Sequence, residues 1–203
     1  MGVYPQLVGP VKLLVDEFSN FARLPTANPR PDDLNRIVAD VVAGYSGTEG
    51  VELRAELAES LPTLDVDREQ MRRALTNLVD NAIAAVRADT GADDQAGHVV
   101  VRTAHEPSLN SVRLEVADDG GGIAPADRRR VFEPYFSTKA RGTGLGLSIV
   151  SRIVADHHGT IRVLGNHPRG ARFVATLPIP RFEGERRRVA PGGIRASVAR
   201  ASG

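Results

Sequence analysis

The sequence contains no cysteine among its 203 residues. This absence excludes disulfides, thiolate zinc sites and cysteine nucleophiles, and it agrees with a reducing compartment. The chain also lacks a run of roughly 18 to 20 apolar residues, the length that a membrane helix needs. Its N-terminus shows no basic region followed by an apolar signal core. We therefore expect this stretch of chain to lie in the cytoplasm.

An excess of charge of either sign is missing as well. Lysine and arginine number 26 against 25 aspartate and glutamate residues, which gives a formal net charge of +1. Such a balance provides no overall field to attract nucleic acid or anionic lipid, so we expect no nucleic-acid partner. An anionic ligand must instead be bound by local groups. With 41% hydrophobic residues, the chain can bury one substantial core.

The chain divides into four parts by composition and periodicity. Apolar residues at spacings of three and four predict a helix over 11–24. Three prolines at positions 25, 29 and 31 end it and predict a linker over 25–31. Residues 32–180 read as one domain, whereas the Arg-, Gly- and Ala-rich residues 181–203 predict a disordered tail.

Within 32–180, helical and strand patterns alternate, which predicts an α/β domain. The predicted helices cover about residues 32–44, 68–87, 125–131 and 145–157. The predicted strands cover residues 51–57, 98–105, 111–117, 160–164 and 171–177.

Two asparagines, Asn77 and Asn81, lie four residues apart and so share one face of the predicted long helix. Stacked carboxamides offer oxygen ligands to a hard cation and N–H donors to phosphate oxygens. The alternative is a solvated surface pair, which is the commoner role of asparagines on helices.

A glycine cluster at positions 120–122 follows Asp118, which ends a predicted buried strand. A carboxylate at this point can accept a hydrogen bond from an exocyclic amino group such as that of adenine. The alternative is an ordinary Asp-Gly turn.

A second glycine cluster spans Gly142–Leu147 at a junction of loop and helix, where backbone amides and the helix dipole favour phosphate. It matches neither the dinucleotide fingerprint nor the P-loop. Upstream, the segment Phe132–Lys139 combines aromatic residues with a cation and is followed by Arg141. This segment is either a lid over about 123–143 with an aromatic anchor or a plain surface loop.

The order and spacing of these motifs resemble the N, G1, F and G2 boxes of sensor histidine kinases over about residues 32–180. The matching residues are Asn77-x-x-x-Asn81-Ala82, Asp118-x-Gly120-x-Gly122, Phe132-x-Pro134-x-Phe136 and Gly142–Leu147. The resemblance implies a two-layer α/β sandwich of the Bergerat type, shared with gyrase, Hsp90 and MutL. Its sheet is mixed, mostly antiparallel and covered on one face by helices.

The resemblance further implies that the domain binds ATP and Mg²⁺. Asn81 is the implied magnesium ligand, Asn77 acts beside it, both are catalytic, and Asp118 contacts the adenine amino group. The implied nucleotide-binding set is Asn77, Asn81, Asp118, Gly120, Gly122, Ile123, Phe136, Lys139, Arg141, Gly142, Thr143, Gly144, Leu145, Gly146 and Leu147.

The implied activity is transfer of the ATP γ-phosphate to a histidine on a dimerisation domain of the same kinase, for relay to a response regulator receiver domain. Hydrolytic relatives carry a glutamate base where this chain has Asn77, and an amide cannot take a proton from water. A gyrase- or Hsp90-like ATPase and a nucleotide-binding regulatory module without transfer remain the alternatives.

Residues 16–25 resemble the end of the second dimerisation helix of NtrY-type nitrogen-regulation kinases, so residues 1–24 are expected to be a remnant of it. The full-length protein is then expected to be a homodimer anchored in the inner membrane, with this domain in the cytoplasm.

Three positions depart from the family pattern. Ala84 stands where many members have a lysine, which places more of the phosphate contact on Lys139 or Arg141. Arg172 stands where the superfamily often has a small hydroxyl residue near the adenine. None of the five histidines lies in a His-Glu-x-x-Asn-Pro context, so this chain alone is expected to be inactive in autophosphorylation.

Overall fold

The computed structural model describes residues 25–89, 96–137 and 143–180. The expected dimerisation-helix remnant, the expected tail and three expected phosphate-side residues, Lys139, Arg141 and Gly142, lie outside the described residues. Within the described ranges, no helix has both the length and the apolar character needed to cross a bilayer.

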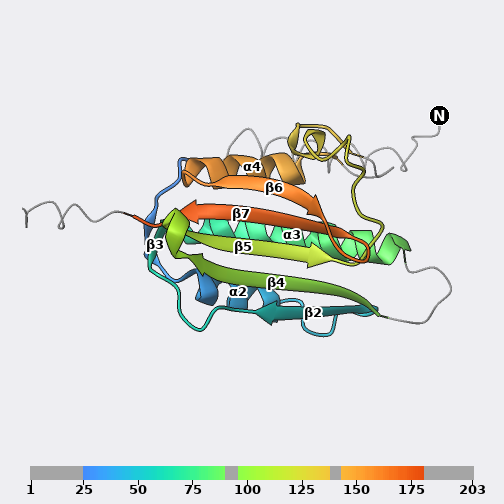
Figure 1. Cartoon of the computed structure of the whole chain (residues 1–203), viewed down its shortest axis with the longest axis horizontal. Coiled ribbons are helices and arrows are strands. Elements are labelled where there is room, and N and C mark those ends of the chain that lie inside the picture. Colours follow the sequence, from blue (N-terminus) through green and yellow to red (C-terminus); the bar gives the residue numbers. More distant parts are fainter. Residues whose placement is uncertain (1–24, 90–95, 138–142, 181–203) are drawn as a thin grey trace, which may run out of the picture.

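A five-stranded sheet forms one layer of the molecule (Figure 1). In spatial order its strands are β2 (Val51–Glu56), β4 (Gly97–Glu106), β5 (Ser111–Asp118), β7 (Ala171–Pro178) and β6 (Thr160–Gly165). The β2–β4 pair is parallel and the other three pairs are antiparallel. The expected mixed, mostly antiparallel sheet is confirmed.

Three helices cover one face of this sheet and form the second layer (Figure 1). They are α2 (Leu34–Ala43), α3 (Arg68–Asp89) and α4 (Gly146–Asp156). Each helix turns one apolar stripe toward alternate residues of the strands, as periods of 3.6 and 2 require. Leu75, Val79, Val101, Val116 and Ile153 are among the fully or almost fully buried residues of this interface. The expected two-layer sandwich is confirmed.

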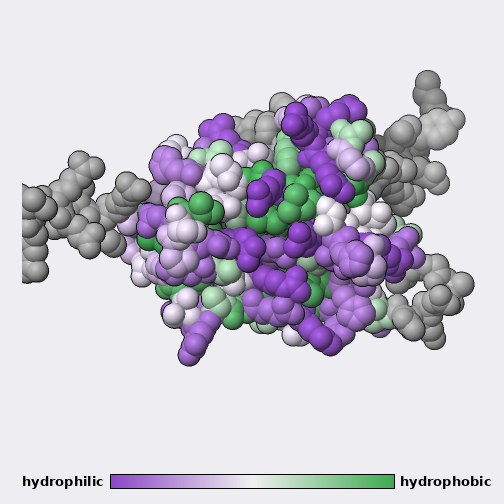
Figure 2. All heavy atoms as spheres, viewed as in Figure 1, coloured by the Kyte–Doolittle hydropathy of each residue, from purple (hydrophilic) through white to green (hydrophobic). Residues whose placement is uncertain are grey.

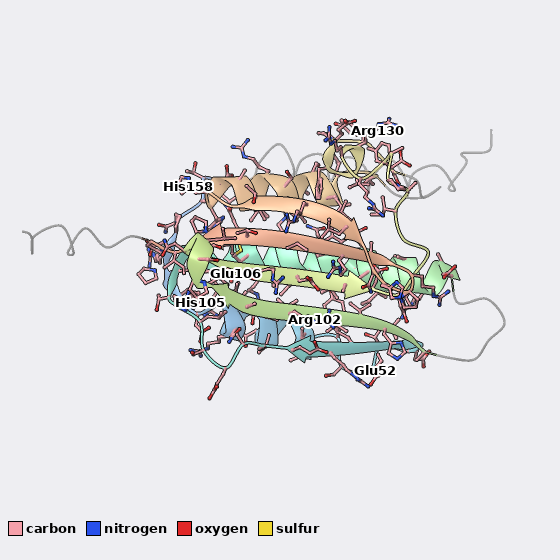
Figure 3. The ribbon with its side chains drawn as sticks, in the orientation of Figure 1. Glu52, Arg102, His105, Glu106, Arg130 and His158 are labelled. Carbon is pink, nitrogen blue, oxygen red and sulfur yellow. The ribbon has the colours of Figure 1, made fainter. Side chains whose placement is uncertain are left out.

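The other face of the sheet is largely hydrophilic (Figure 2). Side chains of opposite charge alternate across β2, β4, β5 and β7 on this face. Arg102 of β4, labelled in Figure 3, donates to Glu56 of β2 at 2.6 Å and to Glu115 of β5 at 3.2 Å. The guanidinium of Arg172 lies 3.8 Å from the same Glu115, whose side chain is only 6% exposed. Opposite charges on neighbouring strands stabilise a sheet face that helices leave open.

A two-stranded sheet lies outside the main one and corrects the expected linker boundary. Strand β1 (Arg30–Asp32) pairs antiparallel with β3 (Leu64–Val66), so positions 30 and 31 of the expected linker belong to the folded domain. The prolines around them exclude a helix and a central strand, but a short edge strand tolerates proline. The carboxylate of Asp32 also accepts hydrogen bonds from Arg68 at 2.6 and 2.9 Å, which ties this sheet to α3.

The short helix expected over 125–131 is absent in that form. The structure has a series of turns at 125–129, followed by the 3₁₀ helix η2 (Arg130–Phe132). Val131 is the buried residue of η2. So short a segment, held at one buried side chain, forms too few hydrogen bonds to maintain an α-helix.

The end of α4 is capped by a residue other than glycine. The left-handed residue is His158, with φ of 58°, rather than Gly159. Hydrogen bonds from His158 N to Ala155 O at 2.9 Å and from Gly159 N to Val154 O at 2.9 Å form a Schellman motif. Glycine is needed at 159 for another reason, since a Cβ there would lie 2.7 Å from Thr176 O.

We predict that His158→Gly stabilises the chain by about 0.5–1 kcal/mol. Glycine adopts the left-handed conformation without the steric cost of a Cβ, which exceeds the extra chain entropy that glycine adds to the unfolded state. Urea unfolding measures the change. The control His105→Gly lies in the extended backbone of β4 and should lose stability. A loss of stability in both variants would contradict the assignment of His158 as the cap.

Candidate functional site

The candidate site lies between α3 and α4, which run antiparallel and contact each other at both ends of α4. A Cβ at Gly146, the first residue of α4, would lie 3.3 Å from Asn77 Oδ1 and 3.7 Å from Asn81 Nδ2. At the other end, the buried His157 accepts a hydrogen bond from the backbone N–H of Asp67, which precedes α3, at 2.8 Å. The start of α4 therefore faces the two carboxamides.

The hydrogen bonds of the two ring nitrogens of His157 define its tautomer. Its Nε2 accepts from Asp67, while its Nδ1 lies 2.7 Å from Ile153 O and donates to it. One accepting and one donating nitrogen define a neutral imidazole. His157 therefore joins the two helices as a neutral side chain.

The carboxamide of Asn77 is oriented by its own helix. Its Nδ2 donates to Arg73 O at 3.1 Å, which turns Oδ1 toward Gly146. Amide oxygens suit a hard cation such as Mg²⁺. Within the ranges that the structure describes, no group of three or more His, Asp or Glu side chains could hold a metal ion. Two amide oxygens supply only part of the coordination of a cation, so they fit a Mg²⁺ that takes most of its ligands from phosphate and water.

The first turn of α4 faces the same point with backbone N–H groups. N–H groups in a first turn have no intrahelical acceptor, and the helix dipole places partial positive charge there. The loop before it is anchored by Leu145, which is fully buried, and Leu145 N donates to Thr143 Oγ1 at 3.4 Å. Gly144 has a φ of 71°, and a Cβ there would lie 2.5 Å from the carbonyl carbon of Tyr135. This geometry can bind an anion.

Aromatic residues hold the preceding segment against the domain. Phe132 packs edge-on against Phe173 with ring centroids 6.3 Å apart, and residues 138–142 of the expected lid lie outside the described residues. The guanidinium of Arg130 lies 4.5 Å from the ring centre of Phe136, at the end of the molecule where Figure 3 labels Arg130. Tyr135 N donates to Gly144 O at 3.0 Å, so this segment contacts the second glycine loop directly.

The first glycine loop lies on α3 as well. A Cβ at Gly120 would lie 2.6 Å from the backbone of Ala85, which leaves no room for a side chain. Asn77, Asn81 and Ala85 are four residues apart and share one face of α3, over about 12 Å. Both glycine loops therefore meet on a single face of one helix.

The carboxylate of Asp118 is buried, with 2% of the residue exposed, at the start of the first glycine loop. Its Oδ1 accepts hydrogen bonds from Gly120 N at 3.1 Å and Ala171 N at 3.2 Å. Charge-assisted bonds of this kind fix both the position and the orientation of a carboxylate.

The neighbouring Asp119 has a different role. His98 donates its backbone N–H to Asp119 Oδ1 at 2.8 Å, and its Nδ1 lies 2.9 Å from Oδ2. Burial raises the pKa of Asp119, but the hydrogen bonds and charge of His98 outweigh burial and hold the pKa below its usual value. Asp119 therefore ties the loop to β4, which leaves Asp118 as the candidate carboxylate of the site.

The family pattern assigned to Arg172 the position that often holds a small hydroxyl residue, but the structure places Ala171 rather than Arg172 beside the Asp118 carboxylate. Arg172 lies on the open face of the sheet with Glu115, whereas Ala171 contacts the Asp118 carboxylate. Neighbouring residues of a strand point to opposite faces, so a shift of one position exchanges the faces. The alternation of buried Ala171, Phe173 and Ala175 with partly exposed Arg172 is the signal that would have located this residue.

The structure brings Gly120 and Gly146 to the face of α3 that carries Asn77 and Asn81. Ile123, Phe136 and Leu147 are partly buried against the core. Gly122 adopts a φ of 74°, which favours glycine. Ala84 is exposed on α3, and the expected basic residues Lys139 and Arg141 lie outside the described ranges.

The domain is similar in sequence to known proteins. Residues 66–181 match the family described as histidine kinase-, DNA gyrase B- and HSP90-like ATPase. Sensor histidine kinase ZraS of Escherichia coli O157:H7 is 35% identical over 150 residues, covering 72% of this chain and 31% of ZraS. Nitrogen regulation protein NtrY of Azorhizobium caulinodans is 34% identical over 164 residues, covering 80% of this chain and 21% of NtrY.

Among solved structures, full-length ShkA in complex with AMPPNP superposes with a TM-score of 0.69 at 31% identity. That match covers 83% of this chain and 35% of the ShkA chain. The chain spans less than a third of the length of the curated relatives ZraS and NtrY.

The close contact between the first glycine loop and α3 predicts different outcomes at two neighbouring glycines. Gly120→Ala should lower the free energy of unfolding by about 1–3 kcal/mol, because its Cβ would push the loop away from the backbone of Ala85. Gly121→Ala is the control, since the nearest atom to its Cβ would be Asp89 Oδ1 at 3.9 Å. Urea unfolding of both variants measures the difference, and equal losses would contradict the observed packing.

Proposed function

The chain belongs to the family of histidine kinase-, DNA gyrase B- and HSP90-like ATPases, and from this membership we propose that it is the ATP-binding catalytic domain of a two-component sensor histidine kinase. One observation carries the proposal above all others. Asn77 and Asn81 on α3 face the first turn of α4 across the glycine at position 146. Cation ligands and phosphate-binding amides thereby meet at one point.

In the proposed complex, Asp118 accepts a hydrogen bond from the exocyclic amino group of adenine, and Ile123 and Phe136 flank the nucleotide. The N–H groups of residues 144–147, together with Lys139, Arg141 and Gly142, contact the phosphates. Asn81 is a ligand of the Mg²⁺ ion, and Asn77 positions the phosphates beside it. When bound, Mg²⁺ neutralises charge on the β- and γ-phosphate oxygens.

The proposed reaction needs positioning more than acid–base chemistry. A neutral imidazole nitrogen attacks the γ-phosphorus, an N–P bond forms as the P–O bond to ADP breaks, and the imidazole proton passes to solvent. The domain holds the γ-phosphoryl group in line and stabilises its charge. The amide of Asn77 has no basic lone pair near neutral pH, so it favours transfer to histidine over activation of water.

The proposed partners follow from the same assignment. The phosphoacceptor histidine belongs to a dimerisation domain of the same kinase, and a response regulator receiver domain takes the phosphate from it. We place the domain in the cytoplasm and the full-length protein in the inner membrane as a homodimer. The likeness to ZraS and NtrY supports a sensor kinase, and the likeness to NtrY supports a role in nitrogen regulation.

Adenine recognition by Asp118 predicts a selective loss of affinity. Asp118→Asn should weaken binding of Mg-ATP about tenfold, because it replaces a charged acceptor with a neutral group, and it should reduce the preference for ATP over GTP. Titration calorimetry with both nucleotides measures this preference. Asp119→Asn is the matched control, since its carboxylate bonds His98, and it should keep the preference. Equal affinity of the unmodified chain for ATP and GTP would remove Asp118 from the adenine site.

The proposed transfer predicts that this chain alone does not become phosphorylated on histidine. His98 is paired with Asp119, and both ring nitrogens of His157 are hydrogen-bonded. His105 and His158 lie at the end of the molecule opposite Arg130 (Figure 3), and His167 lies in the turn between β6 and β7. Incubation with ATP labelled on the γ-phosphate should give no acid-labile phosphoprotein.

Addition of a dimerisation domain of the NtrY type should give acid-labile label on the added domain, and a His→Gln variant of that domain should give none. Label on this chain alone would overturn the assignment. Sustained ATP hydrolysis without the added domain would favour a gyrase- or Hsp90-like ATPase. Tight ATP binding without transfer to any dimerisation domain would favour a regulatory nucleotide-binding module.

A further inference from the structure

The turn between β6 and β7, residues 166–170, docks onto the end of β5. The N–H of Asn166 donates to Gly170 O at 2.9 Å, which closes the turn. The side-chain Nδ2 of Asn166 donates to the backbone carbonyl of Asp118 at 2.8 Å, across 48 positions of sequence. The turn is therefore bonded to the residue that carries the carboxylate of the site.

Two glycines allow this docking to be close. Gly170 has a φ of 102°, and the backbone of Asp118 occupies the space that a Cβ would take. Gly122 lies on the other side, where a Cβ would come within 2.9 Å of Gly170 O. The turn and the first glycine loop thus meet backbone to backbone, so a shift of one is transmitted to the other.

The residue that follows the turn also forms a hydrogen bond with the Asp118 carboxylate. Ala171, the first residue of β7, donates its N–H to Asp118 Oδ1. The same oxygen accepts from Gly120 within its own loop. The carboxylate is therefore held between two backbone donors, one of which is placed by the turn that Asn166 closes.

An ion pair between Arg169 and Asp89 at 2.6 Å connects the same turn to the end of α3. The Arg169 side chain is 59% exposed, and ion pairs at such exposure contribute little. Asn166 is partly buried and bonds the backbone of Asp118 itself. Of the two contacts, that of Asn166 controls the position of the carboxylate.

We propose that Asn166 is a positioning residue for purine recognition, which sets the preference of the site for a purine with an amino group at position 6. This inference rests on the proposed binding of adenine by Asp118. Asn166 acts through Asp118, because its amide fixes the end of β5 and thereby the direction in which the carboxylate accepts. Hydrogen bonds weaken steeply with misalignment, so a displaced carboxylate loses the amino group before it loses the phosphates.

The test compares the dissociation constants of Mg-ATP and of Mg-purine riboside triphosphate, which lacks the 6-amino group. Asn166→Ala should weaken ATP about fivefold and leave the purine analogue nearly unchanged, so that the ratio falls. Arg169→Ala is the matched control in the same turn and should keep the ratio. Asn166→Ser retains a short hydrogen-bond donor, so it is expected to fold even if Asn166→Ala does not. It should recover part of the preference for ATP over the purine analogue.

A double-mutant cycle locates the effect. In an Asp118→Asn background, Asn166→Ala should change the ratio no further, because the carboxylate it positions is absent. If the unmodified chain shows no preference for ATP, the adenine assignment of Asp118 fails. If the preference exists but survives both Asn166 variants, or if Asn166→Ala weakens both nucleotides equally, the positioning role is overturned while the proposed function stands.

Discussion

The antiparallel contact between α3 and α4 is the constraint on which the rest of the molecule depends. Glycine at 146 lets the start of α4 approach Asn77 and Asn81, and the neutral His157 fixes its other end to Asp67. Burial raises the pKa of Asp67, but the backbone hydrogen bonds that its carboxylate accepts from Asn28, Gln70 and Glu69 outweigh burial and hold the pKa below the usual value. The same carboxylate thereby caps α3 and binds the segment before β1.

Function follows from what each layer supplies to that contact. In the proposed complex, the helices supply carboxamides for the cation and backbone N–H groups for the phosphates, and the sheet supplies the buried carboxylate of Asp118 for the base. Glycines at 120 and 146 remove the side chains that would separate loop from helix. Because the amide of Asn77 cannot serve as a base, the same architecture that hydrolyses ATP elsewhere in the family is suited here to presenting a phosphoryl group.

Periodic patterns and motif spacing were sufficient to predict the sheet, the three helices and the positions of Asn77, Asn81 and Asp118. They failed where the structure depends on contacts distant in sequence. The pairing of β1 with β3 is too short to produce a period, and proline obscured it. The choice between Ala171 and Arg172 required strand register, and Asn166 bonds Asp118 across 48 positions without any local motif. His158 took the left-handed position for which glycine was the natural expectation.

In the proposed complex, a single nucleotide joins α3, α4 and the end of β5. A crystal structure of the chain with a non-hydrolysable ATP analogue and Mn²⁺ tests it most directly, since manganese can be located by its anomalous scattering. We expect manganese to be coordinated by Asn81 and by phosphate oxygens, and the adenine amino group to contact Asp118. Manganese bound away from Asn81, or an adenine ring that does not contact Asp118, would contradict it.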